Sequence, residues 1–287
     1  MENKNWGKKY MLVLWSITLV VILCGLAYNL GGFGFHYLSA TNVGEYEDFD
    51  YSGEEFSSID VNIDAADLDI RYGDTYMVST NIPKKYQPVI NVKDGKLEIQ
   101  QKKLNHSINS FKSLKEECSI EITIPTGTKL EDVDIVVDAG DIDIETVKGK
   151  SISISADAGD IDLKNVEFES TTVAADAGDI KAKDSKLGKL KIEADLGDID
   201  ADKTDFDYGK ITADMGDISI DGAFNRLEAE CDLGNIDITT PNPDYDNMDL
   251  DVSLGSITVN GKKWLTTDSI VHIFPLTQSA IIRCMNI

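Results

Sequence analysis

Apolar and polar residues alternate through most of the second half of the chain, and a glycine interrupts the alternation at nearly constant spacing. Isoleucine, valine and leucine recur at every second position with Asp, Ser, Thr, Lys and Glu between them, which is typical of β-strands with one buried face. Successive glycines are 19, 19, 19, 19, 18 and 21 residues apart, at Gly140, Gly159, Gly178, Gly197, Gly216, Gly234 and Gly255. Such a period predicts a stacked repeat, in which each unit buries its apolar face against its neighbours.

The aligned repeats predict the path of each unit. The second residue after each glycine is always isoleucine, at Ile142, Ile161, Ile180, Ile199, Ile218, Ile236 and Ile257. We expect a strand of about seven residues, a corner at the glycine, a strand of about five residues and a short return. A unit of this length has no room for a crossover helix, so the strands should stack in parallel. The sequence therefore predicts an all-β, single-domain β-solenoid, parallel β-helix-like, with the isoleucine column as its buried spine.

Weaker β signals precede the regular rungs, which are expected from about residue 133. Ile59–Ile70 matches the same columns with Ala66 in place of the glycine, and we interpret it as a degenerate first rung. Pro88–Gln100 contains an Asp-Gly turn between alternating apolar residues, which predicts a hairpin. Ser119–Pro125 predicts another strand, ended by its proline. This part should cap the amino end of the solenoid.

The amino-terminal residues 11–30 contain no charged side chain and are long enough to cross a bilayer. Lys4, Lys8 and Lys9 precede them and acidic residues follow, so the positive-inside rule places the amino terminus in the cytoplasm. A cleaved signal peptide is the competing interpretation, because Gly25-Leu26-Ala27 resembles a small-residue cleavage site. The apolar run is long for such a peptide, so we expect a transmembrane helix. The protein would be a single-pass protein of the cell membrane with its C-terminal domain extracytoplasmic.

These signals divide the chain into segments. Residues 45–55 contain six acidic side chains and no basic one, so this stretch should be repelled from the membrane. The expected segments are a cytoplasmic tail (1–10), a transmembrane helix (11–30), an acidic linker (31–55), the β-solenoid repeat domain (56–261) and a C-terminal cap or divergent tail (262–287).

The chain is strongly acidic, with a formal net charge of −24. Residues 31–287 carry 50 acidic against 24 basic side chains, which argues against binding to nucleic acid or lying on anionic lipid. Cys118, Cys231 and Cys284 lie outside the predicted membrane segment and are too widely spaced for a disulfide framework. Cys231 takes a column otherwise filled by alanine or valine, so we expect it in the core.

Three sequence features together carry a family resemblance. They are the opening Phe56-Ser-Ser-Ile-Asp-Val61, the strand Cys118-Ser-Ile-Glu-Ile-Thr-Ile-Pro125 and the serial x-Asp-x-Gly-Asp-Ile-x-Ile rungs. Over roughly residues 50–261 the chain resembles the bacterial putative-adhesin family of β-strand-repeat proteins, a domain of unknown function of Gram-positive envelope type. The resemblance implies the repeat fold, and some members of the family are associated with cell-envelope stress systems. It implies no catalytic residues.

The sequence gives little support to an enzyme. His36, His106 and His272 are isolated, and the carboxylates repeat identically on every rung, whereas acid–base catalysis needs one pair in different environments. Phe168, Phe206, Tyr208 and Phe224 lie near the returns but share no column, so a carbohydrate-binding face is weakly indicated.

We therefore expect a non-enzymatic, adhesin-like or envelope-stress-linked interaction module. Its partners would be the membrane, through one helix, and an envelope protein or cell-wall component. A polysaccharide-active β-helix hydrolase or lyase is the alternative.

Aspartates form two further columns beside the glycines, two positions before and one position after. Stacked rungs would place these carboxylates about 4.8 Å apart, where like charges repel and hard divalent cations find oxygen ligands. The simplest interpretation is a solvated corner, because Asp tolerates turn geometry. No cofactor is expected beyond weakly bound Ca²⁺, and a weak Ca²⁺ ladder is the metal-site hypothesis. Its residues are Asp138, Asp141, Asp157, Asp160, Asp176, Asp179, Asp195, Asp198, Asp214, Asp217 and Asp232.

Overall fold

A computed structural model describes residues 46–101, 118–241 and 243–264 of the chain. The predicted transmembrane segment 11–30 and all three histidines lie outside these residues. The described residues include no helix that is both long and apolar enough to cross a membrane.

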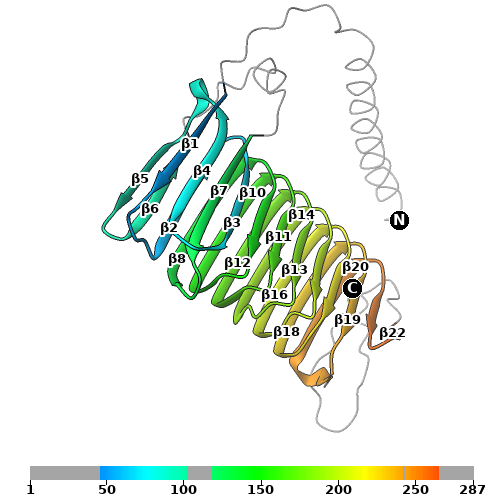
Figure 1. Ribbon diagram of the computed structural model, residues 1–287. Coiled ribbons are helices and arrows are strands. Elements are labelled where there is room, and N and C mark those ends of the chain that lie inside the picture. Colours follow the sequence, from blue (N-terminus) through cyan, green and yellow to red (C-terminus); the bar gives the residue numbers. More distant parts are fainter. Residues whose placement is uncertain (1–45, 102–117, 242, 265–287) are drawn as a thin grey trace, which may run out of the picture. The chain divides into compact units, whose positions relative to one another are not determined.

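Each repeat contributes a long strand to a ten-stranded sheet and a short strand to a twelve-stranded sheet (Figure 1). The long strands are β8 (Lys129–Ala139), β10 (Lys148–Ala158), β12 (Glu167–Ala177), β14 (Lys189–Leu196), β16 (Phe206–Met215), β18 (Phe224–Leu233) and β20 (Met248–Leu254). The short strands are β9 (Ile142–Glu145), β11 (Ile161–Lys164), β13 (Ile180–Lys183), β15 (Ile199–Asp202), β17 (Ile218–Asp221), β19 (Ile236–Thr239) and β21 (Ile257–Val259).

Consecutive long strands pair in parallel, and so do consecutive short strands, with each residue beside the one that occupies its position in the next rung. This confirms the predicted all-β solenoid with rungs of about 19 residues. The two strands of a rung are less equal than expected, because the long strands reach 11 residues and the short strands only four.

The amino end of the solenoid is closed by strands that break the repeat. β2 (Ser58–Ile63) and β3 (Asp67–Gly73) pair in parallel with β8 and β9, which confirms the degenerate first rung. β5 (Val89–Lys93) and β6 (Lys96–Gln100) form the predicted antiparallel hairpin at the end of the ten-stranded sheet. In the other sheet, β7 (Ser119–Pro125) confirms the predicted strand and pairs with β3 and with β4 (Met77–Pro83). A short 3₁₀ helix, η1 (Lys84–Tyr86), follows β4, and another, η2 (Tyr245–Asn247), precedes β20.

Two segment boundaries differ from those expected. β1 (Tyr46–Ser52) pairs antiparallel with β4, so the acidic linker expected over residues 31–55 is wrong for these residues. Tyr51 of this strand packs against the hydrophobic core, which holds the segment to the sheet despite its acidic composition. At the other end, β22 (Lys262–Trp264) pairs antiparallel with β21, so the sheet continues past residue 261.

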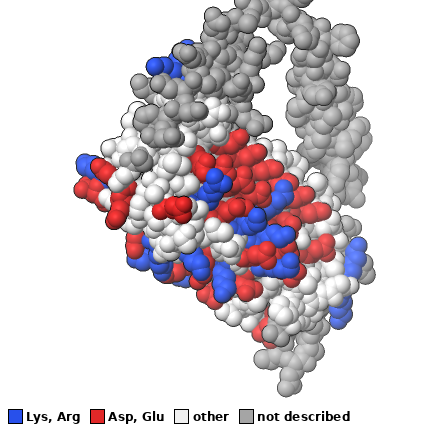
Figure 2. Space-filling view, viewed as in Figure 1, with Lys and Arg blue, Asp and Glu red and all other residues white. Residues whose placement is uncertain are grey.

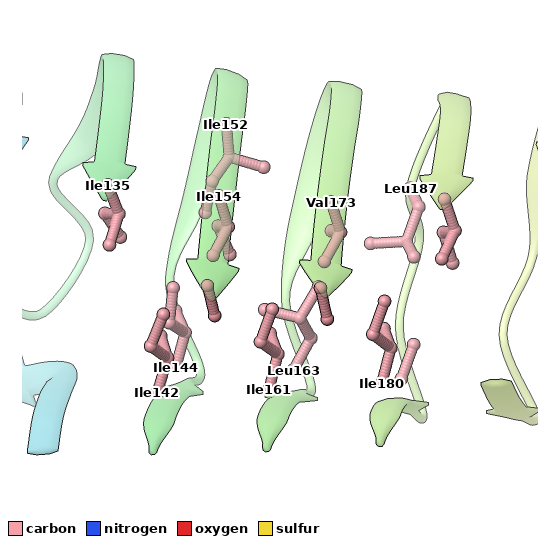
Figure 3. Close-up of a cluster of buried hydrophobic side chains, with 14 of the residues drawn as sticks. Ile135, Ile142, Ile144, Ile152, Ile154, Ile161, Leu163, Val173, Ile180 and Leu187 are labelled. Carbon is pink, nitrogen blue, oxygen red and sulfur yellow. The ribbon is translucent and has the colours of Figure 1, made fainter. Parts of the chain in front are cut away.

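The core lies between the two sheets and repeats from rung to rung. All seven isoleucines that follow the glycines by two positions are at most 1% exposed. Figure 3 shows Ile142, Ile161 and Ile180 at equivalent places on successive rungs, with Ile154 and Val173 of the opposite sheet facing them. Burying each such side chain is worth about 1.5–3 kcal/mol. The isoleucine column is therefore the spine that the sequence predicted, and Cys231 lies in the core as expected.

The returns between a short strand and the next long strand contain left-handed residues that are not glycine. Thr146, Asn165, Asp184 and Lys203 have φ between 49° and 61° and occupy the same position of four successive rungs. Asn and Asp tolerate this conformation, whereas Thr and Lys rarely adopt it. Tight stacking of the returns therefore imposes the turn on whatever residue is there.

Candidate functional site

The corner at each repeat glycine is shaped by two separate constraints. The repeat glycines from Gly140 to Gly234 have φ between 140° and 158°, a backbone conformation that residues with a Cβ rarely adopt. A Cβ on Gly178 would also lie 2.0 Å from the carbonyl oxygen of Gly159 on the preceding rung. Backbone thus packs directly on backbone along the corner, and the residues on either side are held at fixed spacing.

The aspartates one position after the glycines form a hydrogen-bonded ladder between rungs. Oδ1 of Asp141 accepts from the backbone N–H of Asp160 at 2.8 Å, and Oδ1 of Asp160 accepts from that of Asp179 at 2.8 Å. The same bond recurs from Asp67 at the start to Asn235 at the end. The bond from Asp198 holds the pKa of Asp179 below its usual value. These side chains join rungs, whereas the sequence indicated only contacts within a local turn.

The aspartates two positions before the glycines are differently placed. Asp157, Asp176, Asp195, Asp214 and Asp232 are exposed, and Asp138 is half-buried. Asp232 accepts a hydrogen bond from the hydroxyl of Ser253 at 3.2 Å. Figure 2 shows acidic side chains gathered on one face of the solenoid with lysine and arginine side chains among them. Lys181 lies close to the corner aspartates, since its Nζ is 3.3 Å from Asp179 and 3.9 Å from Asp160.

The structure brings the eleven predicted metal ligands to one line of corners, in the two columns that the repeat period implies. Among the described residues, no three His, Cys, Asp or Glu side chains are grouped so as to hold a metal ion. One oxygen of each of the five aspartates that follow a glycine is already occupied by a backbone N–H. The weak Ca²⁺ ladder stays a prediction.

A third acidic column, which the sequence analysis did not single out, lies on the outer face of the short strands. Burial raises the pKa of Asp69, Asp143 and Asp162, and neighbouring carboxylates in this column add to the effect on Asp143. Lys181 takes the same position in the next rung. The signal for this column was the same 19-residue spacing, counted three positions after the glycine.

On the opposite edge of the rungs, where the returns enter the long strands, the surface is hollowed into a groove of about 1150 Å³. It extends from Tyr72 and residues 126–129 at one end, past the starts of β10, β12, β16 and β18, to residues 240–247 at the other. We call this hollow the return groove. It crosses seven rungs and is therefore longer than a site for a small molecule.

An apolar column lies along the return groove. Gly149 is in register with Phe168, Phe206 is in register with Phe224, and the last two rings stack with centroids 5.3 Å apart. The expectation that Phe168, Phe206 and Phe224 share no column is therefore wrong. Each precedes the next repeat glycine by ten residues, but the 18-residue rung hides this when positions are counted from the preceding glycine. Phe168 and Phe206 are buried, and Phe224 is half-buried.

Charged side chains of both signs form the rim of the return groove. Lys148 contacts Glu167 at 2.7 Å, and Lys129 contacts Glu169 at 2.8 Å. Hydrogen bonds from these lysines lower the pKa of both glutamates. Lys186 continues the same position as Lys148 and Glu167 in the next rung. The rim thus alternates in charge at the spacing of the rungs.

Comparison with known proteins identifies the repeat. Residues 56–269 match the family model described as Toastrack DUF4097. A solved structure described as a putative adhesin from Parabacteroides distasonis is 18% identical, with a TM-score of 0.50, and the alignment covers 75% of this chain and 96% of that chain.

Two further solved structures match at lower similarity. A putative adhesin from Bacteroides fragilis is 18% identical with a TM-score of 0.45, covering 77% of this chain and 98% of that one. A putative cell adhesion protein from Clostridium sporogenes is 12% identical with a TM-score of 0.39, covering 75% and 99%. No curated protein matches the chain.

Proposed function

Because the chain belongs to the Toastrack DUF4097 family, we propose that it is a non-enzymatic, adhesin-like interaction module of the cell envelope. The observation that carries this proposal is the return groove, which crosses seven rungs and carries charged rim residues in register from rung to rung. Stacked strands repeat at about 4.8 Å, so an extended chain can make similar contacts on successive rungs. The groove would accept an extended segment of a partner protein.

The rim of the groove favours a polypeptide over a glycan. Glycan-binding faces present exposed aromatic rings, whereas in this groove Phe168 and Phe206 are buried and Tyr72 and Phe224 are half-buried. Alternating Lys148, Glu167 and Lys186 would instead pair with both kinds of charged side chain on a protein. We therefore infer an envelope protein as the partner, with a cell-wall glycan as the outcome that would contradict this inference.

The alternative of a polysaccharide-active enzyme finds no support in the groove. A hydrolase of that kind keeps one carboxylic acid protonated near neutral pH, with a raised pKa. Glu167 and Glu169 have lowered pKa values, because each accepts a hydrogen bond from a lysine. The aspartates with raised pKa lie on the short strands, away from the groove.

We further propose that residues 11–30 anchor the domain and hold it outside the cytoplasm, as the uncharged run and the preceding lysines indicate. The domain is acidic, so it would stand away from anionic lipid rather than lie on it.

The groove proposal can be tested by reversing charge on its rim. Lys148→Glu with Lys186→Glu changes the rim, and Lys164→Glu with Lys183→Glu makes the same charge change at exposed ends of short strands outside the groove. Proteins captured after crosslinking of intact cells would be quantified for wild type and both variants. We expect the rim variant to lose a captured protein that the control variant keeps. Equal capture by both variants, or binding to purified cell-wall glycan that only the rim variant loses, would overturn the proposal.

A further inference from the structure

The residue immediately before the repeat glycine changes character along the solenoid. It is alanine in the first three regular rungs, at Ala139, Ala158 and Ala177. In the next four rungs it is large and apolar, and these residues form what we call the corner stripe: Leu196, Met215, Leu233 and Leu254. They lie in register on consecutive strands and are 46–56% exposed. An unbroken exposed line of large apolar side chains costs free energy in water and marks an interaction surface.

Acidic columns on both sides of the corner stripe restrict what can cover it. Asp195, Asp214 and Asp232 precede the stripe residues, and Asp198 and Asp217 follow the glycines next to it. A second copy of the chain would bring its own aspartates against these columns, and an anionic bilayer would be repelled. The occupant should therefore be apolar and free of acidic groups.

The described part of the chain ends beside the corner stripe. β22 pairs antiparallel with β21 so that Trp264 lies opposite Ile257, which follows Leu254 by three residues. Trp264 therefore lies at the corner of the last rung, where the stripe itself ends. The large apolar residues are also confined to the four rungs nearest Trp264. A separate partner molecule would not require the stripe to lie at this end of the solenoid.

The composition of the remaining residues matches the stripe. Residues 269–287 contain no Asp or Glu, one arginine (Arg283) and 11 apolar side chains, in a chain with 51 acidic residues in total. Four rungs extend over about 15 Å, which about five extended residues can cover. The 23 residues after Trp264 are more than sufficient.

From this placement we propose that residues 269–287 dock along the corner stripe of their own chain. Their apolar side chains cover Leu196, Met215, Leu233 and Leu254, and Arg283 is placed among the flanking aspartates. The C-terminal segment thereby shields an apolar surface on the edge of the solenoid opposite the return groove.

A photo-crosslinker placed in the stripe identifies the occupant directly. The full chain, held in lipid nanodiscs, would carry Met215→p-benzoylphenylalanine, with Ala158→p-benzoylphenylalanine as the control at the same position outside the stripe. We expect the residue at 215 to crosslink within its own chain to residues 269–287, and the residue at 158 not to do so. Crosslinks from 215 to a second copy or to lipid, or no yield above that of the control, would overturn the proposal.

A second measurement gives the extent of docking. Cys118 and Cys231 are buried, and burial raises the pKa of the Cys231 thiol to about 11, so the reactive thiol after residue 30 is that of Cys284. Leu233→Glu should raise the rate of maleimide labelling of Cys284 about tenfold, as expected from losing the contact of one buried leucine. Ala158→Glu adds the same charge outside the stripe and should leave the rate unchanged. Equal rates in wild type and Leu233→Glu would contradict docking at the stripe.

Discussion

The carboxylate of Asp141 accepts a hydrogen bond from the backbone N–H of Asp160, which follows it by 19 residues, with 2.8 Å between Oδ1 and N. The bond links two corners that are neighbours only because the rungs stack. It assigns a role to an aspartate that repeats through the array: the side chain satisfies a backbone donor that the sharp corner leaves without a strand partner.

Removing one link of this ladder should cost stability in proportion to the lost bond. Asp160→Ala leaves the N–H of Asp179 without its acceptor and should lower the free energy of unfolding by about 1–2 kcal/mol. Asp160→Asn keeps an acceptor, as Asn235 does naturally in the same column, and should be close to neutral. Asp157→Ala, at the exposed column, should change stability by less than about 0.5 kcal/mol. Urea unfolding of the three variants would measure this, and equal losses at positions 157 and 160 would refute the ladder.

The two constraints on the corner glycines can be separated by a matched pair of substitutions. Gly127 has φ of 91° and no atom within 4 Å of an added Cβ, so Gly127→Ala should cost only the backbone strain, about 1–2 kcal/mol. Gly178→Ala adds a collision with the carbonyl oxygen of Gly159 at 2.0 Å and should cost more than about 4 kcal/mol. Thermal melts would compare the two, and similar losses would show that the rungs can move apart.

The raised pKa values on the short strands predict a pH dependence with a defined sign. Burial, reinforced by Asp162, raises the pKa of Asp143 above that of an unfolded aspartate, so the folded state binds this proton more tightly. The carboxylate therefore lowers stability above its folded pKa, and this cost fades as the pH falls toward about 4.

Asp143→Asn should accordingly melt at a higher temperature than wild type at pH 7, with a smaller difference at pH 4. Glu167→Gln should change the melting temperature at pH 7 in the opposite direction, because the hydrogen bond from Lys148 lowers the pKa of Glu167. That carboxylate contributes stability at pH 7 that is lost on acidification. A melting-temperature difference between Asp143→Asn and wild type that is larger at pH 4 than at pH 7 would contradict the raised pKa of Asp143.

The Ca²⁺ hypothesis concerns the paired aspartate columns at the corners. Repulsion between stacked carboxylates should be relieved more by a divalent cation that bridges rungs than by screening alone. Millimolar CaCl₂ should raise the melting temperature of the protein more than NaCl at matched ionic strength, and EDTA should reverse the gain. Equal stabilisation by the two salts would mean that screening accounts for the whole effect.

The anchor hypothesis predicts the fate of the domain on intact cells. External protease should remove the solenoid and leave a short membrane-embedded fragment that contains residues 11–30. Immunoblots with tags at either end would follow both parts. Recovery of an intact domain in the medium, starting near Tyr28, would instead indicate that the segment is a cleaved signal peptide.

The regular rungs could be predicted because stacking buries the same position of every rung. The isoleucine two positions after each repeat glycine shows this burial directly in the sequence. The return groove could not, because its apolar column depends on Phe224, which the 18-residue rung shifts out of step with Phe168 when counted from the preceding glycine. The left-handed returns were also hidden, since Thr146 and Lys203 are not residues that favour them. The hydrogen bonds of the corner aspartates join residues a full rung apart, and local turn preferences do not reveal such contacts.

The parallel register between rungs also bears on how such a protein changes over generations. Tandem duplication or loss of the 57 bases that encode one 19-residue repeat adds or removes a whole rung and leaves every remaining neighbour relationship intact. The length of the solenoid can therefore change during evolution in steps of about 4.8 Å, because each added rung packs against its neighbours in the same way as the existing rungs.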